Sequence, residues 1–128
     1  MTKHEGRCEC GAVRFEATEL RPTVVFCHCS QCRRTSGHHW AATHVPLDRF
    51  RLTREEGLAW YQSSDHARRG FCRICGSSLF YQPLGGAIMS IAAGSLDAPT
   101  GLRPGKHIFV ASKGDYYQIA DGLPQVED

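Results

Sequence analysis

Seven cysteines in three groups constrain this chain more than any other feature of its 128 residues. They form an N-terminal pair, a central trio and a later pair: Cys8 and Cys10; Cys27, Cys29 and Cys32; Cys72 and Cys75. Grouped cysteines in a chain without a signal peptide are typical of metal ligands, and an odd number argues against a closed set of disulfides. The sequence therefore predicts a fold that is stabilised by bound zinc.

The residues around the central trio predict how its sulfur atoms meet. Its first two cysteines are two residues apart, so on an extended backbone both sulfurs leave the same face. Ser30 is a good helix N-cap and Gly37 a good C-terminal stop, so we expect a short helix over residues 31–36. Cys32 would lie in the first turn, where the helix dipole favours a thiolate. Three sulfurs arranged in this way can hold one Zn²⁺ with an open fourth position, as in catalytic zinc sites.

The seven cysteines can be divided between two zinc sites in more than one way. A closed structural zinc needs four ligands, and the simplest division gives it the N-terminal pair and the later pair. The later pair lies in Cys-x-x-Cys-Gly, which is typical of a zinc knuckle in a hairpin turn. In an alternative division, the later pair joins Cys27 and Cys29, which leaves Cys32 beside an unpaired N-terminal pair.

A further alternative closes the central trio with a histidine, which would make a second structural site. The histidines nearest to the trio in the sequence are the candidates: His28, His38, His39 and His44. His28 lies between two ligands on a strand, so we expect its side chain to face away from them.

Strand signals dominate the rest of the chain and predict an all-β fold with one short helix. Alternating apolar residues at Val13, Phe15 and Ala17 indicate a half-buried strand. Further strands are expected over 23–26, 38–45, 50–53, 58–62, 71–81 (as a hairpin), 87–93 and 106–110. Of these, 50–53 and 58–62 are expected to pair with each other around a four-residue turn. The unbroken apolar run at 87–93 predicts burial on both faces. Residues 63–70 are polar, residues 94–106 are expected as a loop, and the tail from Lys113 is expected to be irregular.

The length of the chain and its charge limit the possible classes of function. A chain of 128 residues with 41% hydrophobic residues suits one domain, residues 1–128. Seven thiolates would subtract seven charges and two Zn²⁺ would add four, so the formal +2 would become about −1. We therefore expect no nucleic-acid or membrane partner. Residues 1–10 contain no apolar signal segment, and no apolar run approaches the ~20 residues of a membrane span, which predicts a cytoplasmic protein.

Four motifs occur in a fixed order: Gly6-x-Cys8-x-Cys10-Gly11-x-Val13-x-Phe15, Cys27-His28-Cys29-Ser30-x-Cys32-Arg33-Arg34-x-x-Gly37, Phe71-Cys72-x-x-Cys75-Gly76-Ser77-x-Leu79 and His107-Ile108-Phe109. Together they resemble the glutathione-dependent formaldehyde-activating enzyme (GFA) family, which includes the centromere protein V relatives, over roughly residues 6–124. The resemblance implies a β-tent of stacked antiparallel sheets and two zinc sites. It assigns a structural zinc to Cys8, Cys10, Cys72 and Cys75, and a second, open and labile zinc to Cys27, Cys29 and Cys32.

The resemblance also implies an activity, the formation or cleavage of S-hydroxymethylglutathione by a zinc-dependent carbon–sulfur lyase. The partners would be a small thiol such as glutathione and an aldehyde, and the central trio would be the catalytic group. We expect Arg33 and Arg34 to bind carboxylates of a glutathione-like substrate, with Arg68 and Arg69 as second choices.

Two other functions are considered beside the lyase. The first is a non-catalytic zinc-binding module, or a carrier of glutathione or of its adduct. The second is nucleic-acid or microtubule binding by analogy with centromere protein V, which the lack of a long basic tract disfavours.

Overall fold

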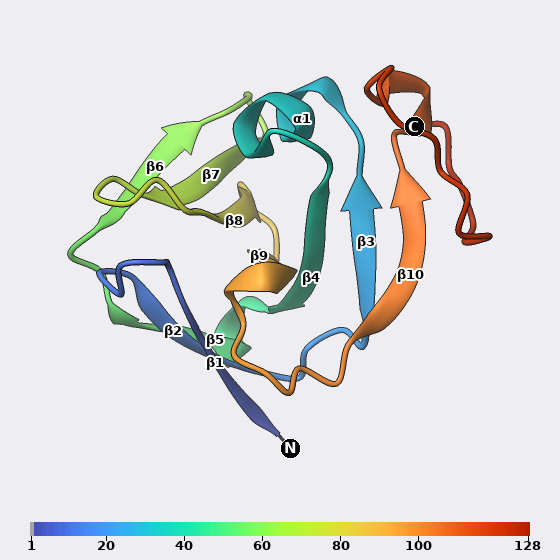
Figure 1. Cartoon of the computed structure of the whole chain (residues 1–128). Coiled ribbons are helices and arrows are strands. Elements are labelled where there is room, and N and C mark those ends of the chain that lie inside the picture. The colour runs from blue at the N-terminus through green and yellow to red at the C-terminus, as the bar shows by residue number, and fades with distance from the viewer. Residues whose placement is uncertain (1) are drawn as a thin grey trace.

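The computed structural model describes residues 2–128 as two stacked β-sheets with little helix (Figure 1). In chain order, the elements are β1 (Lys3–Arg7), β2 (Arg14–Thr18), β3 (Thr23–Cys27), α1 (Ser30–Ser36), β4 (Trp40–Pro46), η1 (Leu47–Arg49), β5 (Phe50–Arg54), β6 (Leu58–Gln62), β7 (Ala67–Cys72), β8 (Ser78–Pro83), β9 (Ile88–Ala92), η2 (Ala93–Ser95), β10 (Arg103–Ile108) and η3 (Val110–Ser112), where η marks a 3₁₀ helix. The predicted all-β class with one short α-helix is confirmed.

The strands form two sheets, and Cys27 ends one strand near the edge of the larger sheet. A three-stranded sheet has the order β1-β2-β5, and a seven-stranded sheet has the order β10-β3-β4-β9-β8-β7-β6. Neighbouring strands are antiparallel except β10 and β3, which run parallel and place Ile108 opposite Cys27. In Figure 1, β3 and β10 lie side by side at one edge of the molecule, with the C-terminal segment just beyond them.

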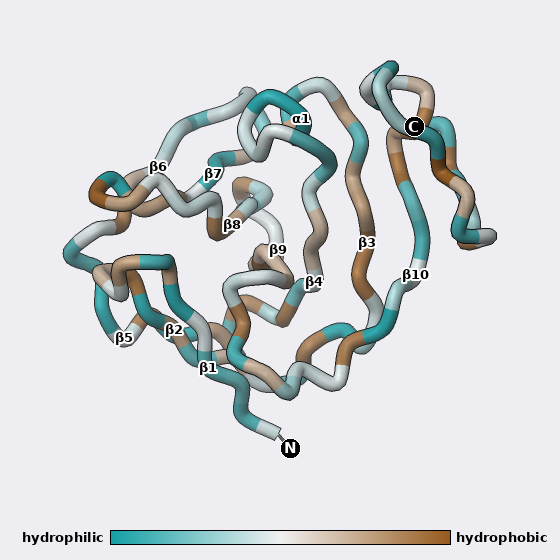
Figure 2. The backbone as a smooth tube through the Cα atoms, viewed as in Figure 1, coloured by the Kyte–Doolittle hydropathy of each residue, from teal (hydrophilic) through white to brown (hydrophobic). Residues whose placement is uncertain are grey.

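The core lies between the two sheets and is built on aromatic rings from both. The ring centroid of Phe80 in the large sheet lies 5.2 Å from those of Phe15 and Phe50 in the small sheet, in edge-to-face contacts. Such pairs add about 0.5–1.5 kcal/mol each to the area that they bury. Figure 2 shows that β3 is also hydrophobic along most of its length. Cys8 and Cys72 are part of this buried core, so the N-terminal and later cysteine pairs lie at its margin.

Two predicted strands have other partners than the sequence suggests. Residues 50–53 and 58–62 do form strands, but the prediction that they pair with each other in a hairpin is wrong. Instead, β5 pairs with β2 in the small sheet, with Leu52 opposite Phe15, and β6 pairs with β7 in the large sheet. Phe50 and Leu52 pack against the core between the sheets, which explains why β5 leaves its sequence neighbour.

Other boundaries also differ from the predicted ones. Strand β7 begins at Ala67, four residues before the predicted hairpin over 71–81, and β1 forms over residues 3–7, where no strand was expected. Burial in β9 alternates, so that Met89 and Ile91 face the core and burial on both faces is wrong. None of the described helices has the length and apolarity that crossing a bilayer demands.

Candidate metal centres and their cavity

The sulfur atoms of Cys8, Cys10, Cys72 and Cys75 meet in one group, which we call the four-cysteine cluster. Each sulfur lies within 4.8 Å of every other. The sulfur of Cys10 is 3.7 Å from that of Cys8 and 3.7 Å from that of Cys72. Zinc–sulfur bonds of about 2.3 Å in a tetrahedron separate the sulfurs by about 3.8 Å. The cluster therefore has the dimensions of a closed tetrathiolate zinc site.

Two turns bring these four cysteines together. Cys8 and Cys10 lie in the turn between β1 and β2, and the backbone N–H of Val13 donates to the sulfur of Cys8 over 3.3 Å. Cys72 and Cys75 lie in the predicted knuckle between β7 and β8, where the Cys75 N–H donates to the Cys72 sulfur over 3.5 Å. A hydrogen bond with the Ser77 hydroxyl is the main reason that the pKa of Cys75 falls to about 5.

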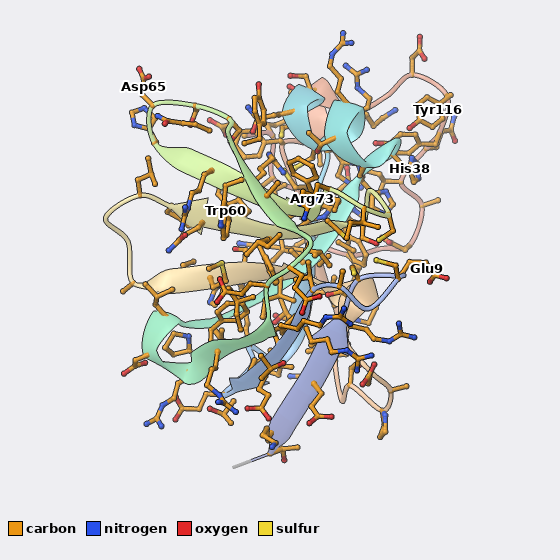
Figure 3. The ribbon with its side chains drawn as sticks, turned by 90° about the vertical axis from the view of Figure 1, so that its left-hand side faces the viewer. Glu9, His38, Trp60, Asp65, Arg73 and Tyr116 are labelled. Carbon is orange, nitrogen blue, oxygen red and sulfur yellow. The ribbon has the colours of Figure 1, made fainter. Side chains whose placement is uncertain are left out.

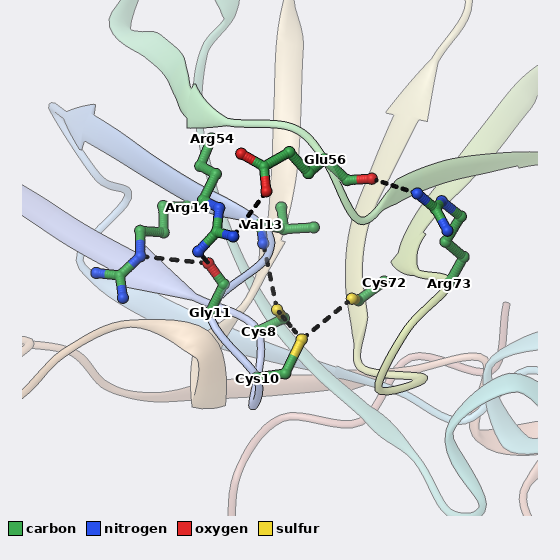
Figure 4. Close-up of polar contacts among 9 residues, drawn as sticks. All are labelled: Cys8, Cys10, Gly11, Val13, Arg14, Arg54, Glu56, Cys72 and Arg73. Atoms are coloured by element: carbon green, nitrogen blue, oxygen red, sulfur yellow. Dashed lines mark hydrogen bonds and ion pairs between the residues drawn. The ribbon is translucent and has the colours of Figure 1, made fainter.

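Arginine side chains brace the loops around this cluster (Figure 4). Arg54 donates to the Gly11 carbonyl over 3.1 Å and pairs with the Glu56 carboxylate at 2.6 Å. Arg73, from the knuckle itself, donates to the Glu56 carbonyl over 2.9 Å. The turn after β5 is thereby tied both to the N-terminal cysteine turn and to the knuckle.

The sulfur atoms of Cys27, Cys29 and Cys32 form a second group, the three-cysteine cluster, again within 4.8 Å of one another. Cys27 ends β3, and α1 begins at Ser30 with Cys29 as its N-cap. The sulfur of Cys29 accepts the backbone N–H of Cys32 over 3.3 Å. The predicted cap at Ser30 is therefore wrong by one residue, whereas the predicted stop at Gly37 is confirmed by its left-handed conformation (φ 88°).

Within the three-cysteine cluster, the thiol proton of Cys27 is hydrogen-bonded to the sulfur of Cys32. A hydrogen bond from Cys27 is the main cause that lowers the pKa of Cys32 to about 6, and Arg69 lowers it further. The same bond, together with burial, raises the pKa of Cys27. A metal cation that replaced this proton would meet one sulfur already present as a thiolate at neutral pH.

Arg69 is the charged side chain that is most tightly built into this centre. It is only 7% exposed, and its Nε donates to the side-chain oxygen of Gln31 over 2.8 Å. Its Nη2 lies 3.5 Å from the sulfur of Cys32, and its guanidinium lies over the rings of Tyr81 and Trp40 at 4.9 and 5.8 Å. No carboxylate among residues 2–128 pairs with it, so the cysteine sulfur is the anionic group that it contacts.

The three-cysteine cluster opens into a cavity of about 460 Å³. Cysteine sulfur lies at one end, with Trp40, Arg69 and Tyr81 beside it, and Arg21 and His44 also belong to the lining. Arg33 and Arg34 on α1 are not among the residues that line this cavity, and Arg34 is exposed. Their role in substrate binding stays a prediction, and Arg21 is a cavity residue that the sequence did not single out. The four-cysteine cluster does not border this cavity.

No histidine among residues 2–128 joins either cysteine cluster within the distance that unites the sulfurs. As expected, His28 faces away from its cysteine neighbours. Its ring is 1% exposed and bonds to Tyr117 Oη at 2.6 Å and to His107 Nδ1 at 2.8 Å. Burial, followed by the neighbouring histidines, lowers the pKa of His28 to about 4, so the ring is neutral.

The C-terminal segment also contacts the end of α1. His38 Nδ1 lies 2.8 Å from the hydroxyl of Tyr116, and Figure 3 places the two side chains next to each other at the edge of the molecule. Tyr116 and Tyr117 therefore contact His38 and His28, two histidines that do not line the cavity.

Comparisons with known proteins agree with this combination of stacked β-sheets and two cysteine clusters. The profile of the family described as "Glutathione-dependent formaldehyde-activating enzyme" (GFA) matches residues 3–112. The chain therefore belongs to the GFA family, which confirms the resemblance seen in the sequence.

Individual relatives carry related names. A Schizosaccharomyces pombe protein named as an uncharacterised lyase is 32% identical over 87 residues, which span 63% of this chain and 58% of that protein. A Halomonas elongata protein, provisionally named as a glutathione-dependent formaldehyde-activating enzyme, is 30% identical over 125 residues, or 90% of this chain and 80% of that protein. The crystal structure of a Rhodobacter sphaeroides protein superposes with a TM-score of 0.65 at 30% identity, covering 73% of this chain and 88% of that one.

Proposed function

We propose that this protein is a zinc-dependent carbon–sulfur lyase that forms or cleaves a thiol–aldehyde adduct such as S-hydroxymethylglutathione. Membership of the GFA family supports an enzyme of this type, as do the names of two relatives, one a lyase and the other a formaldehyde-activating enzyme. In the forming direction, the thiol sulfur bonds to the aldehyde carbon while the carbon–oxygen double bond becomes a single bond. The proton that leaves the sulfur is balanced by the one that the new hydroxyl gains.

The observation that carries this proposal is that the three-cysteine cluster has no fourth cysteine, histidine or carboxylate ligand within residues 2–128 and opens into a cavity. A zinc ion held by Cys27, Cys29 and Cys32 would supply a position that binds and activates a thiolate. The four-cysteine cluster, with its tetrahedral spacing, would hold the structural zinc. The second site, with one ligand fewer from the protein, is expected to be the more labile of the two.

Electrostatics decide whether such a centre accepts an anionic sulfur. Three thiolates and one Zn²⁺ carry a net charge of −1, and a substrate thiolate would add another negative charge. The buried guanidinium of Arg69 lies against Cys32 and offsets part of this charge. Arg69 therefore lowers the electrostatic cost of binding a substrate thiolate at this centre.

Holding the thiol and the aldehyde next to each other supplies most of the expected acceleration of adduct formation. A sulfur fixed at the cluster meets the aldehyde inside the cavity, which replaces a bimolecular encounter in water by a local one. Arg33 and Arg34 remain the proposed contacts for substrate carboxylates from the α1 side. Because the reaction and its ligands require reduced thiols, the proposal includes a cytoplasmic location.

The test is Cys29→Ser, because serine keeps the helix cap while it removes a sulfur ligand. We expect the variant to retain the fold and one zinc per chain, and to lose turnover of glutathione with formaldehyde. Thr35→Ala, on the exposed side of the same helix, is the control and should keep both zinc ions and activity. Unchanged turnover in Cys29→Ser would refute the lyase proposal, and thiol binding without turnover in the wild type would indicate a carrier instead.

A further inference from the structure

The floor of the cavity is one face of the seven-stranded sheet, and its residues follow from the strand register. Alternate residues of β4 point into the cavity: Trp40, Ala42 and His44. Cross-strand pairs then continue in a single row, because His44 is opposite Ser90, Ser90 opposite Tyr81, and Tyr81 opposite Arg69. Directly opposed residues share a face, so the row runs from β4 to β7 across the cavity floor.

Several polar side chains in and beside this row have no hydrogen-bond partner in the described part of the chain. Among residues 2–128, the side chains of His44, Ser90, Tyr81 and Arg21 make no hydrogen bond or ion pair with one another or with other residues. We call these four residues the polar strip. Arg69, in contrast, is already bonded to Gln31 and Cys32. The strip can therefore donate hydrogen bonds to a molecule in the cavity without breaking any within the protein.

Arg21 gives the strip its positive charge. Its backbone is fixed, since its N–H donates to the His44 carbonyl over 2.9 Å and its carbonyl accepts the Thr43 hydroxyl over 2.7 Å. No aspartate or glutamate lines the cavity in the described part of the chain. An anion at this end would thus meet one free guanidinium and no repelling carboxylate.

The two ends of the cavity are separated by an apolar stretch. Val25 and Ala42, directly opposite each other on β3 and β4, lie between the cysteine sulfurs and the far end of the strip at Arg21 and His44. At about 3.3 Å per residue, Trp40 and His44 are about 13 Å apart along β4. Phe109 faces this stretch with a left-handed backbone (φ 55°, ψ 39°), a conformation unusual for a bulky residue and often found where a ligand is held.

We propose that the polar strip, with Arg21 as its charged member, binds a carboxylate of the thiol substrate while the sulfur of that substrate lies at the three-cysteine cluster. This proposal rests on the proposed function and makes Arg21 a specificity-determining residue. The substrate class is a thiol whose carboxylate is several bonds away from its sulfur, with an intervening chain that fits against Val25, Ala42 and Phe109. Glutathione meets this description, whereas a small neutral thiol would use the cysteine end alone.

The experiment compares three thiols on the zinc-loaded protein by titration calorimetry: glutathione, its diethyl ester and 2-mercaptoethanol. The ester keeps the length of glutathione but masks its carboxylates. We expect Arg21→Met to weaken glutathione binding ~10- to 100-fold, the range for loss of a charged hydrogen bond, and to change binding of the ester and of 2-mercaptoethanol less than about twofold. Arg21→Lys should recover part of the loss, and Arg103→Met, an exposed arginine outside the cavity, should change nothing.

The outcomes distinguish a failure of the polar strip from a failure of the proposed lyase activity. Equal weakening of all three thiols by Arg21→Met, or unchanged glutathione binding, overturns the role of the strip even if turnover persists. If glutathione binds with the predicted dependence on Arg21 but no turnover is found, the lyase fails and the strip stands. If none of the three thiols binds the wild-type protein, both proposals fail.

Discussion

The Nη2 atom of Arg69 lies 3.5 Å from the sulfur of Cys32, although the two residues are 37 positions apart in the chain. The arginine reaches this place from β7, beneath the helix that carries the cysteine. A buried guanidinium without a carboxylate partner is costly unless an anion lies next to it. The contact therefore favours the thiolate form of Cys32 and lowers its pKa.

Replacement of Arg69 tests this electrostatic link through pH. In protein that holds metal only at the four-cysteine cluster, thiolate absorbance at 240 nm should contain one group that titrates near pH 6, and Cys32→Ser should remove it. Because a lowered thiol pKa means that the thiolate persists to lower pH, Arg69→Met should shift this group upward, toward the ordinary cysteine value of 9.0. Arg68→Met is the matched control, because the guanidinium of Arg68 lies over the ring of Trp60 and not at the cysteine sulfurs. A titration unaltered by Arg69→Met would contradict the link.

Gly57 tests how tightly the four-cysteine cluster is packed. A Cβ atom at this position would lie 2.7 Å from the Cys72 sulfur and 2.9 Å from the Ala12 Cβ. Gly57→Ala should therefore lower the free energy of unfolding by about 1–3 kcal/mol and speed zinc loss to a chelator. Gly94→Ala provides the control, because nothing lies within 4 Å of its added Cβ. Equal zinc retention and equal melting temperatures in the two variants would show that the cluster is loosely packed.

A chain of hydrogen bonds fixes the C-terminal segment to His28 and His107. The Asp121 carboxylate lies 2.8 Å from His107 Nε2, His107 Nδ1 lies 2.8 Å from His28 Nε2, and the Tyr117 hydroxyl lies 2.6 Å from His28 Nδ1. The carboxylate of Asp121 can only accept, so His107 Nε2 donates to it. The bond from His107 also lowers the pKa of Asp121.

Removal of the carboxylate at the end of this chain should loosen the tail. We expect Asp121→Ala to reduce stability by about 1–2 kcal/mol and to speed hydrogen exchange at the Val126 amide, which donates to the His107 carbonyl. Asp97→Ala, at an exposed aspartate with no side-chain partner in residues 2–128, should stay within about 0.5 kcal/mol of wild type. Unchanged exchange at Val126 would mean that the tail is held by other contacts.

The sequence predicts local features of this fold better than the pairings between them. Cys-x-x-Cys-Gly predicts the knuckle, and Gly37 predicts the end of α1, because both depend on a few adjacent residues. The partner of β5 could not be read in the same way, since its choice of β2 depends on the aromatic core between the sheets. The polar strand β1 gives almost no hydrophobic signal, so it was missed.

The same distinction holds for the candidate site. Cysteine spacing predicts the local groups, because each turn brings its own sulfurs together, but it leaves open that the N-terminal pair joins the later pair. The burial of Arg69 has no local signal, because its partners Gln31 and Cys32 lie on a distant helix. Arg21 is likewise placed in the cavity only by the register between β4 and the segment before β3.

The central claim is that the two metal centres differ in one protein ligand, and that a thiol supplies it. Cadmium NMR of the protein loaded with ¹¹³Cd²⁺ tests this most directly, because the chemical shift reports the number of sulfur ligands. We predict two resonances, of which the one from the three-cysteine cluster moves to the four-sulfur region when glutathione is added, while the other stays fixed. A spectrum in which neither resonance responds to the thiol would contradict the account.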